Sequence, residues 1–177
     1  MRWWLLVVLA GLAGCSSGGG APREERALPE PITVSSPAFA AGATIPKRFT
    51  CQGENVSPPL AWSGVAAGTA EVALVVDDPD APRGTFVHWV VVGLDPTRAR
   101  LAEGAVPAGA RQLPNSAGSA AYTGPCPPGG PAHHYRFTVY ALGRAPEVAG
   151  DADPEAAVQA IEAAATARGR LVGTFGR

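Results

Sequence analysis

Titratable side chains gather where three predicted β-strands begin or end. Aspartates follow the apolar run 71–76, a histidine lies within the run 86–92, and two histidines precede the run 135–142. In chain order these polar residues are Asp77, Asp78, Asp80, His88, His133, His134 and Tyr135. Carboxylates and imidazoles that meet at one site can bind a metal, transfer protons, or hold an anion on protonated imidazole. The sequence therefore predicts a polar site at these strand ends.

Each of these residues also has a purely structural interpretation. Aspartates beside proline in a turn mostly bond to their own backbone, and a lone histidine in an apolar strand is commonly a hydrogen-bonded core residue. Alternation along 86–92 predicts that His88 lies on the strand face opposite Trp89. Because His133 and His134 are consecutive, they should also point to opposite faces, so at most one of them reaches a given site.

Motifs of the familiar enzyme and metal-binding classes are absent from the sequence. It contains no His-Glu-x-x-His, Gly-x-Ser-x-Gly, Walker-type or Cys-x-x-Cys pattern. A three-ligand Asp/His/His metal site is conceivable, but no paired spacing of ligands on one helix or strand supports it. No metal and no cofactor is therefore predicted.

The segment 124–142 joins a stiff loop to a strand. Four prolines between residues 124 and 131 have fixed φ angles and no N–H group, so this part cannot be a helix or an inner strand. Aromatic and β-branched residues alternate with other residues from 135 to 142, as in a strand. A stiff loop that delivers polar groups from a sheet edge is a common way to build a binding site.

Short strands and turns dominate the remaining sequence. Extended segments are predicted at 32–34, 61–62, 71–76 and 86–92, a strand–turn–strand edge at 39–50, and a long loop or several short ones at 95–119. Near the C-terminus, Asp153 and Pro154 start a helix with a narrow apolar stripe. Gly169 should end that helix, and 171–175 should form a last strand. This order favours a mainly β fold, a β-sandwich or open barrel-like domain with a peripheral helix.

The composition fits one globular domain. The chain has 177 residues, 16% of them charged, with 22 glycines and 18 prolines, which favours turns and short strands over a helical bundle. Its formal net charge is −1, and it has no run of Lys and Arg. Nucleic acid is therefore not expected as a partner.

The N-terminus predicts export and a lipid anchor. Arg2 precedes a short apolar run, and the sequence that ends in Cys15 resembles the lipobox of bacterial lipoproteins. Residues 1–14 are then a signal peptide, Cys15 is lipidated, 15–31 is a flexible tether, and 32–177 is the domain. An ordinary secretory signal with an incidental cysteine is the alternative. On the favoured reading the protein is anchored in the bacterial cell envelope, with its domain on the periplasmic or extracellular side.

Two cysteines remain for the exported domain. Oxidation is expected there, so a disulfide between Cys51 and Cys126 is the preferred prediction. Two free thiols, or a reactive Cys126 beside His133, are the alternatives.

Three separated motifs resemble those of phosphatidylethanolamine-binding proteins, and in particular their bacterial branch of Raf kinase inhibitor-like proteins. They are Asp-Pro-Asp-Ala-Pro at 78–82, Val-His-Trp-Val-Val at 87–91, and Gly-Pro-Cys-Pro-Pro at 124–128 followed by His133 and Tyr135-x-Phe-x-Val-Tyr-Ala-Leu. The segments 55–60 and 171–175 fit the same pattern. The resemblance extends from about Ile32 to the C-terminus.

The resemblance implies two antiparallel sheets with a C-terminal helix and a small pocket for an anion such as phosphate or a phospholipid head group. Carried over by position, the pocket residues would be Asp78, Pro82, His88, Pro128, His133 and Tyr135. One departure concerns His134, because the family often has His-Arg-Tyr where this chain has His-His-Tyr. Carboxylates near the imidazoles should favour imidazolium, which with a tyrosine hydroxyl can hold a phosphate.

The resulting hypothesis is a membrane-anchored binding protein for a small anionic ligand, with a role as ligand-regulated modulator of a protein partner left open. One alternative is a hydrolase or lyase that acts on a phosphoester or lipid through Asp78, His88 and His133. Another is an inhibitor of proteases or other enzymes that acts through its exposed loops.

Overall fold

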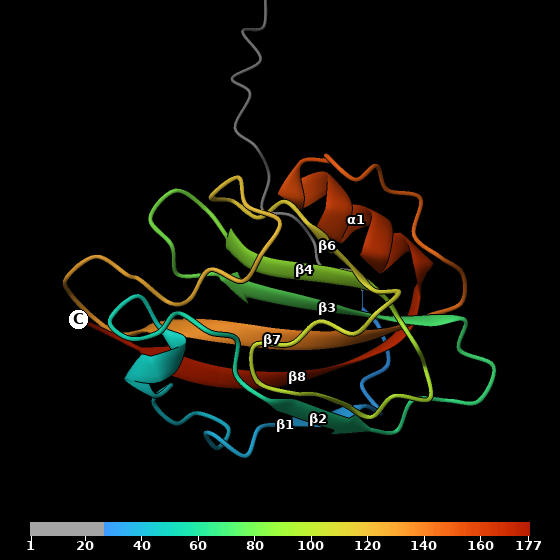
Figure 1. Cartoon of the computed structure of the whole chain (residues 1–177), viewed down its shortest axis with the longest axis horizontal. Helices are drawn as coiled ribbons and strands as arrows, with labels where there is room; N and C mark the ends of the chain where they lie inside the picture. The colour runs from blue at the N-terminus through green and yellow to red at the C-terminus, as the bar shows by residue number, and fades with distance from the viewer. Residues whose placement is uncertain (1–26) are drawn as a thin grey trace, which may run out of the picture.

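The structure, a computed structural model, describes residues 27–177 as two antiparallel sheets and one helix (Figure 1). The small sheet has the strand order β1 (Thr33–Ser35), β2 (Leu60–Ser63), β5 (Arg100–Leu101). The large sheet has the order β6 (Arg111–Leu113), β4 (Phe86–Leu94), β3 (Glu71–Asp78), β7 (His133–Leu142), β8 (Ala165–Phe175). The helix α1 (Pro154–Ala164) completes the fold. The predicted mainly β class with a C-terminal helix is confirmed.

Two apolar layers cover the faces of the large sheet. One lies between the sheets and includes Trp62 of β2 and Trp89 of β4. The other lies between the large sheet and α1, where Ile161 is fully buried. Strand β3 is central and contributes to both layers, which explains why the run 71–76 is apolar without alternation. Each fully buried Val or Leu stabilises the fold by roughly 1.5–3 kcal/mol.

The helix begins as predicted but ends earlier. The Asp153 carboxylate accepts a hydrogen bond from the Glu155 N–H at 2.9 Å, as an N-cap does. The helix stops at Ala164, and Ala165 already belongs to β8. The predicted end at Gly169 is wrong because residues 165–175 pair with the whole length of β7. Strand pairing here overrides the local helical tendency of an alanine-rich segment.

The predicted strand–turn–strand edge at 39–50 is also wrong. The segment contains turns, an isolated bridge between Thr44 and Thr174, and the 3-10 helix η1 (Lys47–Phe49). It buries Phe39, Ile45 and Phe49 between the sheets without forming a strand. The long segment 95–119 contains the short strands β5 and β6, as the alternative of several short loops allowed.

Contacts with the domain begin ahead of Ile32, where the domain was expected to start. Leu28 is buried beneath α1, the Pro29 carbonyl accepts the Arg168 N–H, and the Arg168 guanidinium pairs with Glu30 at 2.8 Å. The predicted signal peptide, Cys15 and most of the tether lie outside the described residues. Within residues 27–177, no helix is long and apolar enough to cross a membrane.

The disulfide between Cys51 and Cys126 is present, with an Sγ–Sγ distance of 2.11 Å. It joins the turn after η1 to the proline-rich loop 124–131, and the Cys51 N–H also donates to the Pro125 carbonyl at 3.1 Å. The loop 124–131 is thus held both by the disulfide and by a backbone hydrogen bond.

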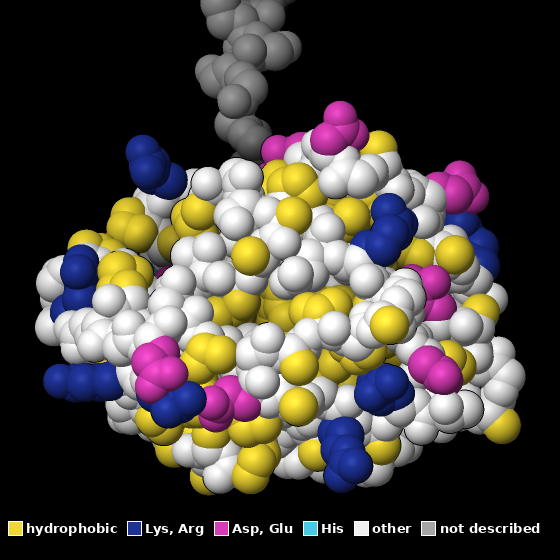
Figure 2. Space-filling view, in the orientation of Figure 1, with side chains coloured by type: hydrophobic (Ala, Val, Ile, Leu, Met, Phe, Trp, Pro, Cys, Tyr) yellow, Lys and Arg dark blue, Asp and Glu magenta, His cyan; other side chains and the backbone are white. Residues whose placement is uncertain are grey.

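On the face seen in Figure 2, basic and acidic side chains are interspersed.

Substitution of Gly169 by alanine should destabilise the fold. Gly169 lies in β8 opposite Val139, and a Cβ atom there would come within 1.8 Å of the Ile32 carbonyl oxygen. We expect the free energy of unfolding to fall by about 1–3 kcal/mol or more, because a backbone atom must move. Gly150→Ala is the matched control, since nothing lies within 4 Å of its Cβ position. Equal urea midpoints for the two variants would contradict this packing.

Candidate functional site

An extra residue in β4 determines where His88 points. Val76 of β3 pairs with Trp89, whereas Asp77 pairs with Val87, so His88 has no partner of its own on β3. This is the geometry of a β-bulge, which re-aims a side chain. The His88 ring packs edge-on against Tyr135, with centroids 5.3 Å apart, and Tyr135 belongs to the same inter-sheet layer as Trp89. The predicted placement of His88 opposite Trp89 is therefore wrong.

The alternation of β3 and β7 sorts the polar residues onto two faces of the large sheet. Asp77 faces the helix side and forms a bidentate ion pair with Arg136, its partner across the strands. His134 forms an exposed pair with Asp80, whose Oδ2 accepts from both the His134 N–H and the ring. The backbone N–H, and then the ring, lower the pKa of the Asp80 carboxyl. Neither pair belongs with His88.

Asp78 and His133 form a largely buried pair on the other face. The His133 Nδ1–H donates to Asp78 Oδ2 at 2.8 Å, and the Asp80 N–H donates to Oδ1 at the same distance. Asp78 is only 3% exposed. Both carboxylate oxygens are therefore engaged, and Asp78 orients the His133 ring through its Nδ1.

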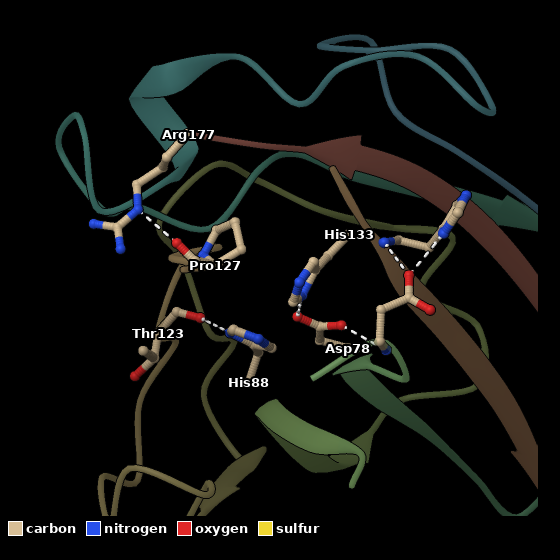
Figure 3. A network of polar contacts seen from close by, with 8 residues as sticks. Asp78, His88, Thr123, Pro127, His133 and Arg177 are labelled. Atoms are coloured by element: carbon tan, nitrogen blue, oxygen red, sulfur yellow. Dashed lines mark hydrogen bonds and ion pairs between the residues drawn. The ribbon is translucent and has the colours of Figure 1, made fainter. Parts of the chain in front are cut away.

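His88 is held as a neutral ring at pH 7. Its Nδ1–H donates to the Thr123 carbonyl at 2.6 Å (Figure 3). The ring also contacts Phe86 and Tyr135, with ring centroids 4.7 and 5.3 Å away. Burial lowers the pKa of His88 below its usual 6.5, although the Thr123 carbonyl and then the carboxylates of Asp78 and Asp77 oppose the shift. The expectation that nearby carboxylates keep this ring as imidazolium is corrected, and Nε2 is a hydrogen-bond acceptor.

Tyr135 brings a buried hydroxyl to the same place. Its side chain is fully buried, and within residues 27–177 the hydroxyl makes no hydrogen bond of normal geometry, although it lies near the Asp78 carboxylate. Burial, and then the charge of Asp78, raise the pKa of the hydroxyl, so it stays protonated. A buried polar group without a hydrogen-bond partner costs stability.

Two further residues near the site were not predicted from any sequence pattern. Buried Asn115 donates through Nδ2 to the Ala121 carbonyl, the Thr123 hydroxyl and the His88 carbonyl, and so fixes the segment that carries the Thr123 carbonyl. Arg177 donates through Nε to the Pro127 carbonyl at 2.5 Å, which places a cation beside the loop (Figure 3). Both are loop or terminal residues that reach the site only through tertiary contacts.

The structure thus brings together four of the six predicted pocket residues, Asp78, His88, His133 and Tyr135, from β3, β4 and β7. Pro82 and Pro128 are exposed on the loops after β3 and before β7. A cavity of about 310 Å³ lies on the opposite side of the large sheet, against α1, and none of the four residues lines it. Among residues 27–177, no group of three or more Cys, His, Asp or Glu side chains could hold a metal ion.

The fold is thus a two-sheet β-sandwich with Asp78, His88, His133 and Tyr135 gathered at one edge of its large sheet. The family model described as phosphatidylethanolamine-binding protein matches residues 35–176, and the chain belongs to this family. The chain is 48% identical over 186 residues to "Putative lipoprotein LppC" of Mycobacterium tuberculosis, covering 96% of this chain and 92% of that one. It is 52% identical over 156 residues to the UPF0098 protein Rv1910c of the same organism, covering 85% and 75%.

Among solved structures, the chain is similar to E. coli YbcL, described as a new member of the mammalian PEBP family. The TM-score is 0.79 at 31% sequence identity, and the match covers 83% of this chain and 99% of that one. The family and the fold expected from the sequence are both confirmed.

The protonation of His88 should appear in the pH dependence of stability. Because its folded pKa is lower than the unfolded value of 6.5, the unfolded chain binds a proton first as pH falls. His88 should therefore contribute a loss of stability that begins near pH 6.5 and ends at its folded pKa. Urea unfolding between pH 8 and 5 should show a shallower fall for His88→Gln than for the unmutated protein. Identical slopes would show that the folded ring titrates normally.

Proposed function

We propose that this protein is a lipid-anchored binding protein of the bacterial cell envelope whose site takes a small phosphate-containing ligand. The observation that carries the proposal is the buried Tyr135 hydroxyl, which lacks a partner next to His88 and the Asp78–His133 pair. A bound oxyanion would supply that partner. Membership in the phosphatidylethanolamine-binding protein family supports this class of ligand.

The groups around the site suit an oxyanion better than a cation. The Tyr135 hydroxyl is a donor, and the guanidinium of Arg177 keeps N–H groups beyond the one bonded to Pro127. Both oxygens of Asp78 are already bonded within the protein, so its role is to orient His133. The prolines and the disulfide preorganise the loop, which reduces the conformational entropy lost on binding.

The anchor is proposed from Cys15 and from similarity to a protein whose name identifies it as a lipoprotein. In a bacterial host with its native signal sequence, Cys15→Ser should move the protein from the membrane fraction to the soluble fraction and should abolish labelling by an alkyne fatty acid. Ser17→Ala serves as the control, because it leaves Cys15 and the disulfide in place. A Cys15→Ser protein that remains membrane-bound would contradict lipid anchoring at this position.

Tyr135→Phe tests the ligand site with two readouts. Removal of an unpartnered buried hydroxyl should leave the ligand-free protein as stable as before, or more stable by about 1–3 kcal/mol. Affinity for inorganic phosphate, measured by calorimetry on the full chain in maltoside detergent, should fall about ten-fold or more, because the donor is lost.

Tyr122→Phe is the matched control. The Tyr122 side chain is partly buried and its hydroxyl donates to the Phe49 carbonyl at 2.8 Å, so its removal should destabilise the protein by about 1 kcal/mol. Phosphate affinity should be unchanged in this variant. Absence of phosphate binding in the unmutated protein, or equal affinity in Tyr135→Phe, would refute the proposed site.

A further inference from the structure

We propose that the site selects a phosphate group that still carries a proton, that is, inorganic phosphate or a phosphate monoester, over phosphate diesters and sulfate. This inference rests on the proposed function and names the ligand class for the same site. The selectivity is assigned to two atoms, Nε2 of His88 and the hydroxyl of Tyr135. Their rings are in contact, although His88 belongs to β4 and Tyr135 to β7.

Three contacts fix the chemical character of His88 Nε2. The Nδ1–H is committed to the Thr123 carbonyl, which can only accept, so Nδ1 carries the proton of the neutral ring. The ring is only 5% exposed and contacts the Phe86 and Tyr135 rings. No hydrogen bond within residues 27–177 uses Nε2. The site therefore offers a neutral nitrogen acceptor to its ligand.

Charged and polar groups face the His88 ring from three sides: strand β3, strand β7 and the loop that contains Thr123. Strand β3 contributes the carboxylates of Asp78 and Asp77, which favour a protonated ring but do not overcome burial. Strand β7 contributes Tyr135, whose hydroxyl stays protonated, and His133, whose Nδ1–H is bonded to Asp78. The loop side contributes the uncharged Thr123 carbonyl. A dianion placed here would lie near the negative charge of Asp78, whereas a monoanion with its own proton reduces that repulsion.

The acceptor of His88 and the donor of Tyr135 match the two kinds of oxygen on a protonated phosphate. A P–OH group can donate to Nε2, and a neighbouring P–O⁻ oxygen can accept from the tyrosine hydroxyl. A phosphate diester or a sulfate presents acceptors alone at pH 7. Binding of either would bury Nε2 without a donor, or would require the ring to take up a proton against its burial.

The test is calorimetry on the full chain in maltoside detergent and phosphate-free buffer, with two matched ligand pairs at pH 6, where about half of a phosphate monoester still carries its proton. Inorganic phosphate is compared with sulfate, and phosphoethanolamine with its diester glycerophosphoethanolamine, which shares the same ammonium group. We expect each protonatable ligand to bind about ten-fold or more tightly than its partner. The two pairs also separate free phosphate and monoesters from an intact lipid head group, which is a diester.

The pH dependence separates this inference from an imidazolium site. Affinity for phosphoethanolamine should fall as pH rises above the second pKa of a phosphate monoester, about 6, whereas weak binding of sulfate should not vary in parallel. If His88 instead binds as imidazolium, all four ligands should weaken together as pH rises. Equal affinities within each pair, or a shared pH slope, would overturn the inference and leave the proposed function standing. No binding of any ligand would overturn both.

His88→Gln tests the residue itself. A glutamine amide can both donate and accept, so the preference for phosphate over sulfate should shrink several-fold. His134→Gln is the control, because His134 pairs with Asp80 on the other face of the sheet, and it should keep the preference. An unchanged preference in a folded His88→Gln would overturn the assignment to His88. If His88→Gln does not fold, the ligand pairs on the unmutated protein still decide the question.

Discussion

The extra residue at His88 in β4 is the constraint on which the site depends. Regular alternation would have placed His88 and Trp89 on opposite faces of the large sheet. The bulge instead brings the His88 ring against Tyr135 and within reach of the Thr123 carbonyl. The residues that surround the ring then set its chemistry, because burial keeps it neutral and the carbonyl selects its tautomer.

The site is rigid because different interactions hold each side of it. Asp78 uses both oxygens to fix His133 and the turn after β3. Asn115 fixes the segment that ends in Thr123, and the disulfide between Cys51 and Cys126 ties the following loop to the turn after η1. In the proposed function a ligand would meet groups that are already oriented, so less conformational entropy would be lost on binding. The buried Tyr135 hydroxyl differs from these groups, because it has no hydrogen-bond partner among the described residues.

The two faces of the large sheet serve different purposes. On the helix side, Asp77 is neutralised by Arg136 in a bidentate pair, which stabilises charge near a cavity of about 310 Å³. On the other side, Asp78 lies against His133 and near an unpartnered hydroxyl. Adjacent aspartates in the sequence thus have separate roles, because consecutive side chains of a strand point to opposite faces.

The sequence by itself determined the strand-rich class, the start of α1 at Asp153, the family and the pairing of Cys51 with Cys126, because these depend on composition, local caps and motifs. It also brought Asp78, His88 and His133 into one candidate site. Only the tertiary structure decided the end of α1, the bulge at His88 and the contacts of Asn115 and Arg177. These features depend on strand register and on partners distant in the chain, which local patterns do not encode.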